Sequence, residues 1–166
     1  AGLKYFLLGS LASCLLLLGI AFIYSHLGLT DFQNIYSLTA SLEKSKFLFN
    51  PLNIGLLFLL AGFLFKLAIF PFHMWIADVY EGSSIPSAIF FSIVPKISIF
   101  IILVRIFQES FYFLFFNWVS CLAFLAVFSI VYGSFIAIKQ KKMKRLLAVS
   151  SIGHMGYALL AFSTSI

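Results

Sequence analysis

Long uncharged apolar runs, separated by short polar stretches, make up most of this chain of 166 residues. A helix of about 20 apolar residues is long enough to cross the hydrocarbon core of a bilayer. Five runs meet that requirement, at about residues 5–29, 52–80, 86–107, 111–138 and 146–166. The pattern predicts an all-α fold with a single transmembrane domain over residues 1–166, a polytopic helix bundle of about five spans.

The polar stretches predict which helix ends share a side of the membrane. Five of the eleven basic residues lie between the last two runs, namely Lys139, Lys141, Lys142, Lys144 and Arg145. Such a cluster marks the cytoplasmic or matrix side of a membrane. Because consecutive spans alternate in direction, the N-terminus and the acidic turn at residues 78–84 are expected on that side. The polar connection at residues 30–50 is expected on the other.

Pro71 lies inside the second apolar run and predicts that this helix is broken near Pro71. Proline lacks an amide donor, and its ring crowds the carbonyl group four residues back, at Leu67. Lys66 lies one turn before the break. Carbonyl groups freed there, together with the negative end of the helix dipole, favour a nearby cation. A broken helix at membrane depth is tolerated only where it faces protein or water.

Two lysines lie within uncharged apolar runs, Lys66 in the second and Lys96 in the third. A charge at the centre of a bilayer costs about 2.5–3.5 kcal/mol on insertion scales, so it persists only where a cavity, water or a counter-charge receives it. Lysine is also a proton carrier. We therefore predict a proton relay through Lys66 and Lys96, with the two side chains facing one another near mid-depth. The alternative is that one of them snorkels, or pairs structurally with a carboxylate on another chain.

The histidines and carboxylates of the spans are weaker candidates. His154, in the fifth run, can serve the same relay through its titratable imidazole, although a lone histidine in an apolar helix is more often a packing residue. His73, just past the break, is a further candidate, and His26 is expected to be structural. Asp78 and Glu81 are expected to cap a helix or to counter the lysines.

The aromatic residues with a polar group predict the interfaces of the membrane. Four are expected in these belts: Trp75, Tyr80, Tyr112 and Trp118.

Composition supports an integral membrane protein, with 63% hydrophobic and 10% charged residues. The mean hydropathy of +1.11 agrees. The net charge of +6 does not indicate a nucleic-acid partner, because the cations are concentrated in one loop. Cys14 and Cys121 show no metal-ligand spacing, and no phosphate-binding or dinucleotide motif is present. No metal and no cofactor are expected on this chain, which leaves proton transfer as its chemistry.

Several strings, in order along the chain, resemble one known family. FKLAIFPFHMW at residues 65–75 and DVYEG at residues 78–82 resemble the central signature of the antiporter-like membrane subunits of respiratory complex I. PKI at residues 95–97 and KRLLAVSSIGHMGY at residues 144–157 are similar to subunit 2 of that complex, called subunit N in bacteria. The resemblance covers nearly the whole chain.

The resemblance implies roles for three residues. Lys66 matches the lysine of the family's broken seventh helix, Lys96 the lysine of the eighth, and His154 the histidine of the tenth. In the family these residues belong to a hydrated proton path. The flavin, iron–sulfur clusters and quinone are expected on other subunits.

The chain resembles only helices six to ten of a fold of about fourteen. The helix that carries the family's glutamate is missing, and Ala77 stands where the family usually has proline. These departures imply either half of a split subunit, completed by a companion polypeptide that supplies the N-terminal helices and the glutamate, or a truncated copy. Further partners implied are other membrane-arm subunits and membrane lipids. The implied location is the mitochondrial inner membrane, as a multi-pass protein, with the bacterial plasma membrane as alternative.

The leading prediction is a proton-translocating fragment of NADH:ubiquinone oxidoreductase, which relays protons through its buried lysines. The first alternative is a subunit of a multisubunit cation/proton antiporter. The second is a structural fragment that no longer pumps.

Overall fold

The computed structural model describes residues 1–41 and 51–164, and it contains no strand within these residues. Its seven helices are α1 (Gly2–Leu27), α2 (Phe32–Ser41), α3 (Pro51–Leu67), α4 (Met74–Gly82), α5 (Ile85–Glu109), α6 (Tyr112–Ile138) and α7 (Met143–Thr164). The helices α1, α5, α6 and α7 are long and apolar enough to cross a membrane, and α3 is a shorter apolar helix. The predicted fold class, an all-α polytopic bundle with a broken second span, is therefore confirmed.

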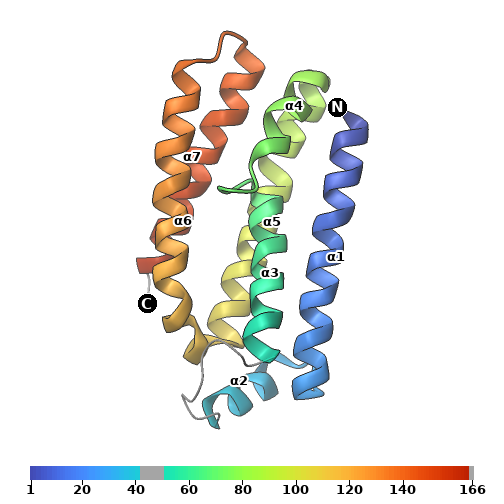
Figure 1. Ribbon diagram of the computed structural model, residues 1–166, viewed down its shortest axis with the longest axis vertical. Helices are drawn as coiled ribbons and strands as arrows, with labels where there is room; N and C mark the ends of the chain where they lie inside the picture. The colour runs from blue at the N-terminus through green and yellow to red at the C-terminus, as the bar shows by residue number, and fades with distance from the viewer. Residues whose placement is uncertain (42–50, 165–166) are drawn as a thin grey trace.

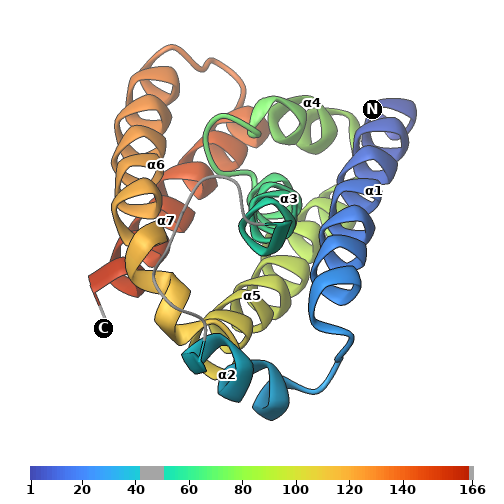
Figure 2. The same cartoon turned by 60° about the horizontal axis from the view of Figure 1, so that its bottom comes forward.

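The helix α3 lies in the middle of the bundle, between α1 on one side and the pair α6–α7 on the other (Figures 1 and 2). Its sequence is apolar on every face, and a helix of that kind is stable only when it is buried. Residues all around its circumference are indeed buried, among them Leu52, Gly62, Leu64 and Phe65. The break at the end of α3 therefore lies inside the protein.

Glycines bring α1 and α3 into close contact. A Cβ atom added at Gly19 of α1 would lie 2.7 Å from the backbone nitrogen of Leu59 and 2.8 Å from the carbonyl oxygen of Gly55. A Cβ at Gly55 would in turn lie 3.0 Å from the carbonyl oxygen of Gly19. Small residues at a crossing allow two membrane helices to approach backbone to backbone. The pair Gly19 and Gly55 therefore sets the distance between α1 and the central helix.

An ionic cluster joins three segments at one end of the bundle. Asp78 of α4 pairs with Lys4 of α1 at 2.5 Å and with Arg145 of α7 at 3.1 Å. Glu81 of α4 pairs with Arg145 at 3.2 Å and also with Lys142. The N-terminus, the end of α4 and the α6–α7 connection therefore meet at the same end, as the alternation of spans predicts (Figure 1).

The expectation of a polar connection at residues 30–50 is wrong in part, because α2 occupies residues 32–41. Apolar side chains recur there at a helical spacing, and Ile35 is buried. Thr39 donates a hydrogen bond from its hydroxyl group to the carbonyl oxygen of Ser110, at 3.2 Å, so α2 caps the junction between α5 and α6 (Figure 2). Glu43, Lys44 and Lys46 lie outside the described residues.

Candidate functional site

The break in the second span begins three residues earlier than the proline. The helix α3 ends at Leu67, and Ala68 adopts the left-handed conformation with φ of 57°. The amide of Ile69 donates to the carbonyl oxygen of Leu64, and the amide of Ala68 donates to that of Phe65, both at 3.0 Å. This pair of bonds is a Schellman motif, which turns the chain out of a helix. The left-handed residue ends the helix, and Pro71 only prevents it from resuming at once.

The two halves of the broken span are tied together by Trp75 of α4. Its indole Nε1–H donates a hydrogen bond to the carbonyl oxygen of Phe65, at 3.0 Å. The two rings also stack, with centroids 5.8 Å apart and planes 18° apart. Trp75 and Tyr80 are both buried, so the expectation that they belong to an interfacial belt is wrong. Trp75 instead satisfies a carbonyl group in the last turn of α3.

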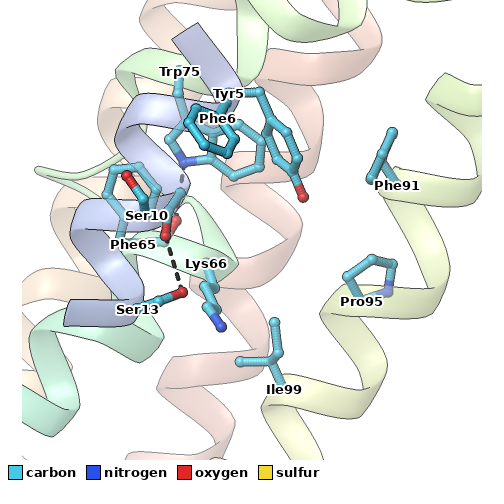
Figure 3. A pocket seen from close by; sticks show the side chains of 11 residues that line it. Tyr5, Phe6, Ser10, Ser13, Phe65, Lys66, Trp75, Phe91, Pro95 and Ile99 are labelled. Carbon is cyan, nitrogen blue, oxygen red and sulfur yellow. Dashed lines mark hydrogen bonds between the residues drawn. The ribbon is translucent and has the colours of Figure 1, made fainter. Parts of the chain in front are cut away.

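Lys66 lines a cavity of about 450 Å³ that the break helps to form. Figure 3 shows its side chain extending into this cavity, with the nitrogen between Ser13 and Ile99. The other walls come from α1, α3, α4 and α5, through Tyr5, Phe6, Gly9, Ser10, Phe65, Trp75, Phe91 and Pro95. Lys66 is half-buried, and within the part of the chain that the structure describes its ammonium group has no hydrogen-bond or ion-pair partner.

Two serines of α1 supply the polar surface of this Lys66 cavity. The hydroxyl of Ser10 donates to the carbonyl oxygen of Leu7 at 2.8 Å, and that of Ser13 donates to Gly9 at 3.1 Å. Each hydroxyl oxygen keeps lone pairs after donating its proton. The serines can therefore accept hydrogen bonds from Lys66 or from water within the cavity.

Lys96 has a different environment. Its side chain is buried, at 4% exposure, and its ammonium group donates a hydrogen bond to Ser151 Oγ of α7 at 2.8 Å. The Ser151 hydroxyl donates in turn to the carbonyl oxygen of Ala148 at 2.6 Å. A second cavity, of about 630 Å³, lies between α5 and α7 and contains Lys96, Ser151 and His154 in its walls. The structure therefore brings together two of the three predicted relay residues.

The expectation that Lys66 and Lys96 face one another is wrong. The two cavities share no lining residue, and α5 contributes a different face to each. Pro95 and Ile99 border the Lys66 cavity, whereas Lys96 projects into the other one. Successive side chains on a helix point about 100° apart, so Lys96 is directed away from the face that Pro95 presents to Lys66.

Sequence reasoning missed Tyr80 as a member of the second cavity. Its hydroxyl group is buried and has no hydrogen-bond partner among the described residues. A tyrosine hydroxyl can donate and accept hydrogen bonds, so it can join a chain of waters toward Lys96. A polar aromatic residue within an apolar run was the only signal, and that signal equally suits an interfacial belt.

His73, Asp78 and Glu81 serve packing or the ionic cluster. His73 lies among aromatic rings, 5.7 Å from the Phe70 centroid and 4.3 Å from that of Tyr132, and it lines neither cavity. Asp78 and Glu81 face cations at the end of the bundle, so they do not counter Lys66 or Lys96. The hydrogen bond from Lys142 lowers the pKa of the Glu81 carboxyl group.

No carboxylate lines either cavity among the described residues. The same residues contain no group of three or more histidine, cysteine or acidic side chains placed to hold a metal ion. The arrangement offers amines, hydroxyl groups and an imidazole, which together can transfer protons.

The chain matches a family model over residues 1–166, and the family is described as NADH:quinone oxidoreductase/Mrp antiporter, transmembrane. It is 46% identical to NADH-ubiquinone oxidoreductase chain 2 of Marchantia polymorpha, over 98% of this chain and 33% of the relative. It is 44% identical to NADH-quinone oxidoreductase subunit N 1 of Rhizobium meliloti, with the same coverage of both chains. The chain thus spans about a third of the length of these relatives.

Two solved structures have a similar fold. A chain of respiratory complex I from Thermus thermophilus with bound aureothin aligns with a TM-score of 0.76 at 37% identity, over 96% of this chain and 33% of the other. A chain of the Mrp complex from Dietzia aligns with a TM-score of 0.86 at 21% identity, over 96% of this chain and 28% of the other. The second likeness concerns the fold alone.

Proposed function

This chain belongs to the NADH:quinone oxidoreductase/Mrp antiporter transmembrane family, and we therefore propose that it relays protons in the membrane arm of an NADH:quinone oxidoreductase. The identity of 46% to a chain 2 and of 44% to a subunit N supports the type of complex. In this proposal the chain is one segment of a proton-translocating enzyme and has no redox centre of its own. The flavin, iron–sulfur clusters and quinone belong to other subunits.

The observation that carries the proposal is the hydrogen bond from the buried Lys96 to Ser151, at 2.8 Å. A carboxylate in that place would hold the ammonium group in its charged form. A hydroxyl group can accept a hydrogen bond from the ammonium form and donate one to the neutral amine. Ser151 can therefore serve Lys96 in both protonation states, which a proton carrier requires.

His154 and Tyr80 extend this site within the same cavity. The imidazole of His154 is exposed at the cavity, where its ring nitrogens can accept and donate protons. The Tyr80 hydroxyl group can join a hydrogen-bonded chain of waters along the wall of this cavity. We assign Lys96 and His154 as proton carriers and Tyr80 as a further polar group of the same cavity.

Lys66 is the third carrier in this proposal. It lies in the last turn of α3, where the negative end of the helix dipole favours a cation. Since no described residue supplies a carboxylate in its cavity, we propose that a companion chain or a further segment of a longer protein supplies one. The proposed setting is the mitochondrial inner membrane, as in a split subunit with lipids and other arm subunits around it, or a bacterial plasma membrane.

The test replaces each lysine separately in the assembled complex. Lys96→Met and Lys66→Met should lower the number of protons moved per NADH oxidised, while the amount of assembled complex stays close to that of the unchanged protein. The matched control is Lys141→Met, because Lys141 is exposed and lines neither cavity. Normal pumping in Lys96→Met and Lys66→Met would contradict the proposal.

A cation/proton antiporter subunit is the second candidate, because the family description covers both kinds of complex. The proteins that co-purify with this chain distinguish the antiporter from the oxidoreductase. Flavin and iron–sulfur subunits in the purified complex support the oxidoreductase. Their absence, together with proton movement that requires sodium or potassium, supports the antiporter.

A structural fragment without pumping is the third candidate, and the lack of a lining carboxylate among the described residues favours it. An assembled complex with no acidic side chain close to Lys66 would support this third candidate. Cross-linking from a cysteine placed at residue 66 to neighbouring chains, followed by mass spectrometry, identifies the segment that covers this cavity.

A further inference from the structure

The peptide group that connects Phe65 to Lys66 is held from the other half of the broken span. Its carbonyl oxygen accepts one hydrogen bond from the amide of Ala68, at 3.0 Å. It accepts a second from Nε1–H of Trp75, also at 3.0 Å. A carbonyl oxygen has two lone pairs, so both are occupied. The first bond belongs to the turn that ends α3, whereas the second comes from α4.

Trp75 itself has little freedom to move. It is buried, and its ring stacks on Phe65 with centroids 5.8 Å apart. The ring of Tyr5, from α1, lies 5.7 Å from it on a tilted plane. Trp75 and Phe65 are also walls of the cavity that receives Lys66 (Figure 3). The indole is therefore a fixed part of the wall beside the lysine.

We propose that Trp75 is a positioning residue for Lys66, because its indole N–H fixes the peptide plane that precedes this lysine and occupies the second lone pair of the Phe65 carbonyl. The inference rests on the proposed function and concerns one of its sites. Two consequences follow. The direction of the Lys66 side chain depends on the position of α4, and the Phe65 carbonyl is not available to capture the ammonium group.

The same contact links Lys66 to the ionic cluster. The cluster holds α4 through Asp78 and Glu81, and Trp75 lies one turn before Asp78 on the same helix. A displacement of α4 moves the indole relative to the Phe65 carbonyl. Trp75 thus transmits the position of α4 to the side chain that carries the proton.

The experiment removes the donor and keeps the ring. Trp75→Phe retains an aromatic side chain without the N–H group. Replacement of Trp75 by benzothienylalanine retains the bicyclic shape and has sulfur in place of N–H, so it serves if Trp75→Phe does not assemble. The matched control is Trp118→Phe, which removes the only other tryptophan and lies outside both cavities.

The readouts are protons moved per NADH and the pH profile of pumping in the assembled complex. One hydrogen bond contributes about 0.5–1.5 kcal/mol, or about two- to twelvefold in an equilibrium. Lys66→Met removes the part of proton pumping that depends on Lys66. We expect both Trp75 variants to reduce that part at least twofold and to shift the pH profile of pumping. Trp118→Phe should change neither readout.

The double variant decides whether Trp75 acts through Lys66. If it does, Lys66→Met with Trp75→Phe pumps as Lys66→Met alone, because the positioned group is already gone. An additional loss in the double variant, or pumping and pH profiles like those of Trp118→Phe, overturns the inference and leaves the proposed function intact. Unchanged pumping in Lys66→Met removes the proposed role of Lys66, and the inference falls with it.

Discussion

The two membrane lysines differ in the partners that the chain gives them. Lys96 is buried and bonded to a hydroxyl group at 2.8 Å. Lys66 is half-buried in a cavity that holds serine hydroxyl groups and no described carboxylate. A buried charge left without a partner carries the full desolvation cost of that group. The environment of Lys96 is thus complete within the described residues, whereas that of Lys66 is open to water or to another segment.

Ser151→Ala tests the completed environment of Lys96. It removes the only hydrogen-bond acceptor of the ammonium group among the described residues, and a hydrogen bond to a charged group contributes about 1.5–3 kcal/mol. Lys96→Met removes the part of proton pumping that depends on Lys96. We expect Ser151→Ala to reduce that part at least fivefold. Ser151→Thr keeps the hydroxyl group and should retain most of it. Equal pumping in Ser151→Ala and Ser151→Thr would show that the bond is unimportant.

Ala68→Gly tests the residue that ends α3. Ala68 has φ of 57°, a left-handed conformation that costs a residue with a Cβ atom about 1–2 kcal/mol. Glycine avoids that cost but loses about 0.4–1 kcal/mol through its more flexible unfolded chain. The Ala68 methyl group is also fully buried, and its removal costs about 0.8 kcal/mol. The three contributions nearly cancel, so we expect the free energy of unfolding to change by less than about 0.5 kcal/mol, measured by denaturant titration in detergent micelles.

Ala77→Gly is the matched control for that substitution. Ala77 lies in the right-handed helix α4, where glycine is about 1 kcal/mol less favourable than alanine. Ala77→Gly should therefore destabilise the protein more than Ala68→Gly does. An equal loss of stability in both would mean that the left-handed conformation of Ala68 is not the property that matters.

The sequence identifies a candidate residue where a titratable side chain lies inside an apolar run. Lys66, Lys96 and His154 satisfy that rule, and the structure places the last two in one cavity. Whether they carry protons stays a prediction. Tyr80 and Trp75 were not identified as site residues, because their roles depend on neighbours that are close in space but distant along the chain, such as Tyr5 for Trp75 and His154 for Tyr80.

At the scale of the helix, the long elements follow directly from apolar length. Short elements follow less well. The helix α2 has ten residues, too few for a membrane span, and its polar residues suggested a loop. The sequence predicts a break near Pro71, since proline is the visible helix breaker. The structure ends it at Leu67, because the turn depends on the backbone conformation of Ala68, which an alanine in a sequence does not indicate.

Gly19→Ala tests the crossing of α1 and α3. A methyl group at residue 19 would lie 2.7 Å from one backbone atom and 2.8 Å from another, so the helices must separate. Overpacking of a well-packed interior costs about 1–3 kcal/mol, and we expect a loss of stability in that range. The measurement is denaturant titration of the protein in detergent micelles.

Gly153→Ala provides the comparison, since Gly153 lies inside α7 and a Cβ atom there would meet no atom within 4 Å. Alanine is about 1 kcal/mol better than glycine within a helix, so this variant should gain stability. Similar losses in both variants would indicate that contact at the crossing does not determine the effect.

For the whole molecule, the sequence pattern established the direction of each span and the end at which the charges meet. It did not establish how the spans are arranged around α3. Apolar runs are alike in composition, so the pattern does not say which helix faces which, and the faces are determined by glycine contacts and by the ionic cluster. The same limit explains why Lys66 and Lys96 were expected to share one cavity.

The ionic cluster makes the stability of the molecule depend on pH, because it joins α1, α4 and α7. The hydrogen bond from Lys142 lowers the pKa of Glu81 below its ordinary value of 4.5. A carboxyl group with a lowered pKa in the folded state contributes stability that is fully present above pH 4.5 and is lost as the pH falls through the folded-state pKa. The same contribution weakens with salt, since the groups are partly exposed.

Glu81→Gln should therefore lower the melting temperature at pH 7 and make it less dependent on pH below 4.5. At a pH below the folded-state pKa, the melting temperatures of the variant and the unchanged protein should converge, because Glu81 is then protonated in both the folded and unfolded states. The control is Glu109→Gln, since the one ion pair of Glu109 within residues 1–41 and 51–164 is with Arg105 of the same helix, at 3.0 Å. Thermal unfolding at pH 7 and across the acidic range measures both variants. A difference at pH 7 that persists unchanged at low pH would show that Glu81 acts through packing and not through its charge.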